Sequence, residues 1–295
     1  MNEKERGFLL LTSTLGDPGR KILTVAQFRT LAQRAAAMER PLTDRDMIPE
    51  DLIALGYDRP AAERIITLLS QTEQLNWYLN KGQKMDCYPI SRVSGDYPAA
   101  LRARLRIDAP GCLWAKGDVS ILKEPAVALV GSRDLQEENL NFAREAGRQA
   151  ALQGITLISG NARGADREAQ EAALAHGGKV ISVVADQLQK QPLTRNVLYL
   201  SQEGFDLGFS SQRALSRNRV IHSLGSMTLV AQCGNKKGGT WSGTKDNLRH
   251  GFSPVFCFDD GSPITQELAG MGAEKITIDG LSDLAKLLPE QNSLF

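Results

Sequence analysis

Residues 126–133 read AVALVGSR, and residues 155–166 read ITLISGNARGAD. Each stretch is an apolar run that breaks into a turn of small residues carrying an arginine, and a helical pattern follows. The runs predict two buried strands of a parallel sheet, with both turns at the edge where open α/β folds bind ligands. Glycine and serine let an anion approach backbone N–H groups, so we expect an anionic ligand, either a nucleotide or a nucleic-acid strand.

The alternation of strand and helix patterns continues along the chain. Strands are predicted at 126–130, 155–158, 180–184, 227–231, 255–258 and 275–278. Helices are predicted at 137–152, 166–176, 195–203, 215–224, 244–250, 263–270 and 281–288. Apolar strands alternating with helices predict an α/β fold with a doubly wound, mostly parallel sheet covered on both faces.

The N-terminal part carries helical patterns instead. Helices are predicted after Thr24, over the shorter stretch 44–55, and from Pro60 as far as Tyr78. Residues 85–118 are punctuated by proline and glycine and predict short extended pieces. We therefore expect two domains, a small all-helical one over residues 1–85 and a sheet domain over residues 86–295.

The composition is that of an ordinary globular protein of 295 residues, with 42% hydrophobic and 23% charged residues. Because the formal net charge is only +1, nucleic-acid binding would require a local concentration of lysine and arginine. The four cysteines form no CxxC pair and are expected to be buried, reduced thiols, and no histidine has metal-ligand spacing. The start, MNEKERGF, lacks an apolar signal core, so we expect a cytoplasmic protein without a membrane partner.

Four clusters of glycines and cations follow the strands or begin helices: 131–133, 159–166, 217–219 and 235–244. Phosphates neutralised by cations give salt-sensitive affinity. Duplex DNA requires a helix or ribbon that enters a groove, and no segment shows one, so a crevice for a single strand fits better. We expect six positive charges within reach of one cleft, from Arg133, Arg163, Arg217, Arg219, Lys236 and Lys237.

Each cluster alone also has a purely structural interpretation. Asp134 could pair with Arg133, Asp166 could cap the following helix, and Trp241 is better explained as core than as a stacking platform. GxGxxG is absent after the first strand of the sheet, Gly239 stands where a P-loop needs lysine, and no GxSxG elbow is present. We therefore expect no cofactor, no metal and no catalytic residue.

The four clusters resemble, in their order, the motifs of the DprA/Smf family of DNA-processing proteins. The resemblance is carried by VALVGSR (127–133), ISGNARGAD (158–166), SRNRVI (216–221) and GTWSGT (239–244), with a similar lead-in over 97–118. It implies an extended Rossmann-like domain that binds single-stranded DNA without turnover. It also implies a homodimer that hands the strand to a RecA-type recombinase, notably in natural transformation.

The cluster positions and the resemblance together give the expected phosphate-binding and DNA-binding residues. They are Gly131, Ser132, Arg133, Ser159, Gly160, Arg163, Gly164, Asp166, Arg217, Asn218, Arg219, Lys236, Lys237, Gly239 and Thr240. The chain departs from the family pattern at Asn161, Ala165 and Gln170, and it stops about where the sheet ends. We therefore expect a divergent member that lacks the C-terminal winged-helix domain.

A second interpretation stays open. The same type of sheet occurs in sensors of nucleotide ligands and in nucleotide phosphoribohydrolases of the lonely-guy type, whose glycine-rich loop precedes a glutamate. Here residues 238–240 and 243–244 resemble that loop, but Asp246 is the nearby carboxylate. Hydrolysis of an N-glycosidic bond requires such an acid to stabilise the transition state or position water.

Overall fold

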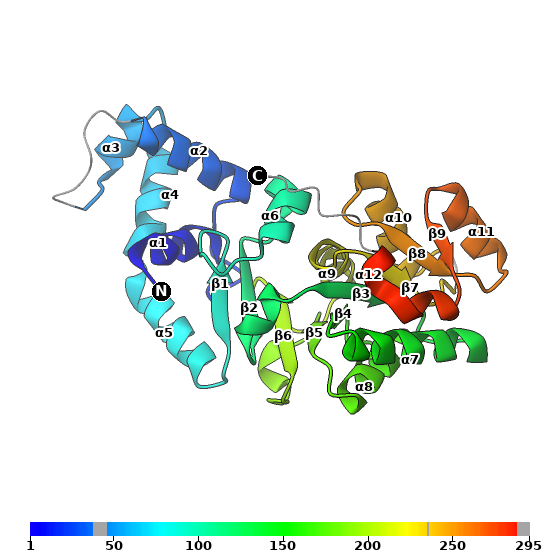
Figure 1. Ribbon diagram of the computed structural model, residues 1–295. Coiled ribbons are helices and arrows are strands. Elements are labelled where there is room, and N and C mark those ends of the chain that lie inside the picture. Colours follow the sequence, from blue (N-terminus) through cyan, green and yellow to red (C-terminus); the bar gives the residue numbers. More distant parts are fainter. Residues whose placement is uncertain (38–45, 235, 288–295) are drawn as a thin grey trace.

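A single mixed sheet organises the protein, as Figure 1 shows for the computed structural model, which describes residues 1–37, 46–234 and 236–287. The strand order is β1-β2-β6-β5-β4-β3-β7-β8-β9. Strands β3 to β9 are parallel, whereas β1 and β2 are antiparallel to their neighbours. The α/β, mostly parallel fold predicted from the sequence is confirmed. The strands are Tyr88–Ser91, Cys112–Lys116, Ala126–Val130, Thr156–Ser159, Val180–Val183, Val197–Gln202, Thr228–Val230, Val255–Phe258 and Glu274–Ile276, β1 to β9 in that order.

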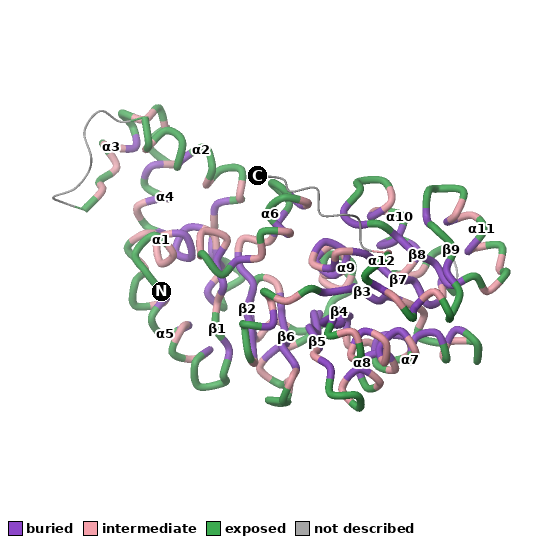
Figure 2. The backbone as a smooth tube through the Cα atoms, viewed as in Figure 1, coloured by how far each residue is buried: buried purple, intermediate pink, exposed green. Residues whose placement is uncertain are grey.

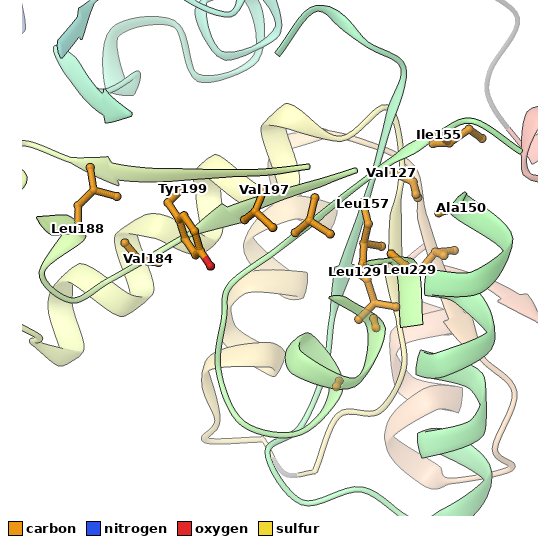
Figure 3. Packing of buried hydrophobic residues seen from close by; sticks show 14 of the residues in the cluster. Val127, Leu129, Ala150, Ile155, Leu157, Val184, Leu188, Val197, Tyr199 and Leu229 are labelled. Carbon is orange, nitrogen blue, oxygen red and sulfur yellow. The ribbon is translucent and has the colours of Figure 1, made fainter. Parts of the chain in front are cut away.

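Helices cover both faces of this sheet. Val127 and Leu129 of β3 pack into one core with α7 and α8, while Ala128 and Val130 pack into another with α6, α9 and α10. Figure 3 shows Val127 and Leu129 gathered with residues of neighbouring strands, and Figure 2 shows the strands as the buried centre. The helices of this part are α6 (Ala99–Leu105), α7 (Glu137–Leu152), α8 (Ala165–Ala175), α9 (Ser211–Leu224), α10 (Gly239–His250), α11 (Pro263–Gly270) and α12 (Leu284–Leu287).

The N-terminal part is helical, as predicted. Thr24 caps its helix by accepting a hydrogen bond from the Gln27 N–H. The helix expected from Pro60 to Tyr78 is two helices, separated at Gln71, and the helix expected over 44–55 begins at Pro49, with residues 44 and 45 outside the described part. The five helices are α1 (Glu3–Thr12), α2 (Val25–Ala36), α3 (Pro49–Ala54), α4 (Arg59–Ser70) and α5 (Thr72–Gln83).

Tyr78 attaches this helical part to the sheet. Its ring packs against Trp114 of β2 and against Phe205, with centroids 5.3 and 4.8 Å away. Its hydroxyl donates to Asp206 at 2.7 Å, and Lys81 pairs with the same carboxylate at 2.8 Å. Residues of α1 and α5 therefore belong to the core that also fills one face of the sheet. The domain division at residue 85 stays a prediction.

One predicted helix, 195–203, is wrong, because these residues form β6. The run from Val197 to Leu200 is apolar at every position, a pattern that fits both a buried helix and a strand buried on both faces. The strand pairs with β5 on one side and β2 on the other, and this tertiary pairing decides the outcome. All four cysteines are free and buried, as expected. None of the helices in the described ranges is long and apolar enough to cross a membrane.

The packing of α7 predicts a large cost for truncating Phe142. This side chain is fully buried and stacks on Phe258, with ring centroids 4.7 Å apart. We expect Phe142→Ala to lower the free energy of unfolding by about 3–5 kcal/mol, measured by urea denaturation. Leu152 ends the same helix and is 58% exposed, so Leu152→Ala should change stability by less than about 0.5 kcal/mol. Equal losses for both variants would contradict this core.

Candidate functional site

A cavity of about 520 Å³ lies at the carboxyl edge of the parallel strands, between the loop after β3, helix α9 and the start of α10. This is the edge at which the sequence places its glycine and arginine clusters. The predicted site residues that line the cavity are Gly131, Ser132, Arg133, Asp166, Arg217, Asn218, Lys237, Gly239 and Thr240. The structure therefore brings members of all four clusters together.

Close contacts between three loops fix the shape of this edge. The Ala165 N–H at the start of α8 donates to the Ser132 carbonyl at 3.1 Å, and the Thr240 hydroxyl donates to the Gly131 carbonyl at 2.8 Å. Gly164 has φ +87°, and a Cβ there would lie 2.5 Å from the Arg133 carbonyl oxygen. Glycine is required at this position by both its backbone conformation and the close approach of the neighbouring loop.

Arg217 holds the second cluster in place from the opposite helix. Its Nη1 donates to the Gly160 carbonyl and, at 2.9 Å, to the Val183 carbonyl, so it joins the ends of β4 and β5. Its Nε is buried and has no hydrogen-bond partner within the described part of the chain. A Cβ on Gly160 would collide with this guanidinium and lie 2.6 Å from the Asp166 carboxylate. Arg217 is therefore a positioning residue, with Nη1 bonded to two backbone carbonyls.

Asp166 forms the acidic partner of this buried charge. Burial raises the pKa of Asp166, and Arg217 nearby opposes that shift. Burial likewise lowers the pKa of Arg217, and Asp166 opposes it. The Coulomb attraction between the two side chains thus offsets part of the desolvation cost of each charge. Asp166 is not the N-cap considered from the sequence: Gly164 has that position, and Asp166 accepts from the Ala162 N–H at 3.2 Å.

Arg133 and the start of α10 offer the accessible positive charge. Arg133 is exposed, and no hydrogen bond or ion pair joins its side chain to another described residue. Helix α10 begins after Gly238, and no side chain of the described residues caps its first N–H groups. Asn218 steadies that end by donating to the Gly239 carbonyl at 3.1 Å. A free guanidinium beside an uncapped helix start is an arrangement that binds anions.

Three of the six cations expected within reach of one cleft are paired with carboxylates. Arg163 pairs with Asp134 at 2.7 Å, Arg219 pairs with Asp246 at 2.6 Å, and Lys236 pairs with Glu267 at 2.5 Å. None of these three cations lines the cavity. The pairing of Asp134 with Arg163 also replaces the pairing with Arg133 considered from the sequence.

Three glycine-cluster residues also lie outside the cavity wall. Ser159 is fully buried within β4, while Gly160 and Gly164 support the wall from behind through the contacts described above. Trp241, by contrast, lines the cavity, but it is buried in the core of that face, in agreement with its interpretation as a core residue. Ser159, Gly160 and Gly164 are not among the residues that line the cavity, and their roles in binding stay predictions.

Sequence reasoning missed several residues of the wall, among them Phe209, Leu215 and His222. Phe209 and Leu215 are 57% and 49% exposed. The available sequence signal was an apolar side chain just before α9 and another in its first turns, each next to a serine. His222 is buried, and its Nδ1 lies 3.1 Å from the Thr228 hydroxyl and 3.2 Å from Nδ2 of Asn247. Burial lowers the pKa of His222 to about 4, so it is neutral at pH 7.

The sequence of this sheet region matches a known protein family. The model of the family described as DNA recombination-mediator protein A matches residues 89–251. The chain belongs to this family. The match contains most of β1, all of β2 to β7 and all of α10, and so contains every residue of the cavity wall named above.

Two curated bacterial proteins are similar to this chain. It is 30% identical over 163 residues to DNA processing protein DprA of Streptococcus pneumoniae, covering 52% of this chain and 54% of the relative. It is 29% identical over 153 residues to protein Smf of Escherichia coli, covering 48% of this chain and 40% of the relative. The chain spans about half the length of the curated relatives it matches.

Solved structures of the family confirm the fold. The S. pneumoniae DprA crystal structure superposes with a TM-score of 0.70 at 23% identity, covering 92% of this chain and 95% of that one. A Helicobacter pylori DNA processing protein A, described for its mode of binding single-stranded DNA, gives a TM-score of 0.57 at 24% identity. That match covers 69% of this chain and 97% of the other.

The contact between Arg217 and Gly160 predicts that a single methyl group there is costly. We expect Gly160→Ala to lower the free energy of unfolding by about 1–3 kcal/mol in urea denaturation, because the guanidinium must move from two carbonyls. Gly208→Ala is the control, since no described atom lies within 4 Å of a Cβ there. If both variants are as stable as the parent, Arg217 does not hold this loop.

His222 predicts a pH dependence of stability. Its folded pKa of about 4 lies below its ordinary value of 6.5, so the unfolded chain binds the proton first as the pH falls. We expect protonation of His222 in the unfolded chain to lower the free energy of unfolding by about 2 kcal/mol between pH 7 and pH 5. In urea unfolding, His222→Gln should lose less stability over that interval than the parent, whereas exposed His176→Gln should follow the parent. Parallel curves for all three proteins would refute the assignment.

Proposed function

We propose that the cavity binds single-stranded DNA through its phosphates. The observation that carries this proposal is the exposed Arg133 beside the uncapped start of α10, on the wall of one cavity at the carboxyl edge. Lys237 lines the same wall and adds positive charge. Because the net charge of the chain is only +1, an anionic ligand is attracted to this local positive charge and not to the protein surface as a whole.

The apolar part of the wall favours a single strand over a duplex. Phe209 and Leu215 are exposed where they line the cavity, and such side chains give unpaired bases a surface to pack on. Bases of a duplex are stacked on one another and unavailable for this contact. The description of the H. pylori relative, which concerns single-stranded DNA binding, supports the same ligand.

We propose a binding protein without turnover. The hydrolase alternative relies on Asp246, and this carboxylate is paired with Arg219 and lines a different cavity. The two carboxylates at the proposed site are also engaged, Asp134 with Arg163 and Asp166 beside Arg217. A sensor of a small nucleotide is the remaining alternative, and it is an outcome of the experiment below.

The wider role follows from the family. Its description as a recombination mediator supports a protein that delivers the strand to a RecA-type recombinase during DNA uptake or recombination. A homodimer and a cytoplasmic location complete this proposal. Sedimentation of the protein alone, with oligo-dT, and with a recombinase would test the partners one at a time.

Replacing Arg133 tests the site directly. We expect Arg133→Ala to weaken binding of a fluorescent twenty-nucleotide oligo-dT by about 1–3 kcal/mol and to reduce the salt dependence, measured by anisotropy at two salt concentrations. The parent should prefer this strand to its duplex. Arg195→Ala is the control, because Arg195 is exposed and precedes β6 at the opposite edge of the sheet.

Two results would overturn the proposal. Unchanged affinity and salt slope in Arg133→Ala would show that the cavity is not the binding surface. If the parent binds neither DNA form, the ligand is instead a small nucleotide, and thermal-shift measurements with a set of nucleotides would identify it.

A further inference from the structure

A second cavity, of about 470 Å³, lies along the seam between α9 and α10. Arg219 and Leu215 reach it from α9, and Lys245, Asp246 and Arg249 reach it from α10. Three cations and one carboxylate therefore surround it. Nothing in the cavity at the carboxyl edge requires this second concentration of charge, because Lys245 and Arg249 lie beyond that wall.

The charges of this seam are not all engaged. The Asp246 carboxylate accepts from Nε of Arg219 at 2.6 Å and lies 3.1 Å from Nδ1 of His250. Its negative charge is therefore compensated locally. Lys245 and Arg249 are exposed, and neither side chain has a hydrogen bond or ion pair with any residue in the described ranges. Two free cations thus remain once the carboxylate is accounted for.

The spacing of the two free cations suits a chain of phosphates. Lys245 and Arg249 are four residues apart on α10, so they lie on one side of the helix about 6 Å apart along its axis. Both side chains are exposed, so a phosphate backbone that follows α10 can contact each of them.

The two cavities are adjacent and share Leu215 as a lining residue. Leu215 is 49% exposed, and α9 and α10 contribute to both walls. Asn218 faces the first cavity and Arg219 faces the second, so consecutive residues of α9 serve the two sides. A strand that leaves the first cavity over Leu215 enters the second without crossing an unpaired carboxylate of the two walls.

We propose that the seam between α9 and α10 is a second subsite for the same DNA strand. This inference rests on the proposed function of the first cavity. Lys245 and Arg249 each contact one phosphate of the nucleotides that leave the first cavity, and Leu215 supports the base between the two sites. Because the contacts are to phosphates, the subsite extends the strand without reading its sequence.

Oligonucleotide length separates the two subsites. We expect the double variant Lys245→Ala/Arg249→Ala to bind twenty-nucleotide oligo-dT on the order of tenfold more weakly, with a salt slope lower by about 1.4. Its affinity for six-nucleotide oligo-dT, measured by competition, should equal that of the parent. Lys84→Ala/Arg195→Ala is a charge-matched control, because both residues are exposed and lie near the opposite edge of the sheet. Urea unfolding of each variant checks that folding is unchanged.

The outcomes distinguish this inference from the proposed function. If the double variant keeps the parent's affinity and salt slope for the long strand while Arg133→Ala lowers both, the second subsite is refuted and the first stands. Equal loss for the short and long strands would also refute it, because the cations would then act at the first cavity. If the parent binds neither length, both proposals fail together.

Discussion

The guanidinium of Arg217 is the contact on which the functional edge of the sheet depends. It lies against Gly160 and donates to carbonyls at the ends of β4 and β5, while the buried carboxylate of Asp166 compensates its charge. The loop after β4 can therefore reach the loop after β3, where Ala165 and Gly164 contact residues 131–133. The position of Arg133 follows from these contacts, because its backbone is held between two loops and the start of α10.

This arrangement separates cations that build the site from cations that are free to bind. Arg217 is half-buried and its Nη1 is occupied by two carbonyls, and Arg163 and Arg219 are paired with carboxylates. Arg133 is exposed and free of ion pairs among the described residues, which is what a phosphate contact requires. A net charge of +1 is therefore compatible with DNA binding, because binding depends on the unpaired positive charges at one edge of the sheet and not on the total charge.

Much of the sheet could be predicted from the sequence, because β3 and β4 carry continuous apolar runs that end in small-residue turns. Strand β6 could not, since its apolar run fits a helix equally well until β2 and β5 are seen on either side. The glycine clusters located the carboxyl edge correctly. The partners of Arg219 and Lys236 could not be foreseen, because Asp246 and Glu267 are distant in sequence and reach them only in the folded protein.

Hydrogen–deuterium exchange with and without oligo-dT tests the central claim most directly, because it reports where the strand lies without changing a residue. The account predicts slower exchange of backbone amides in peptides covering 131–134 and 238–241, and little change at the opposite edge around 193–197. Protection confined to that opposite edge or to the N-terminal helices, with tight binding of the strand, would contradict it.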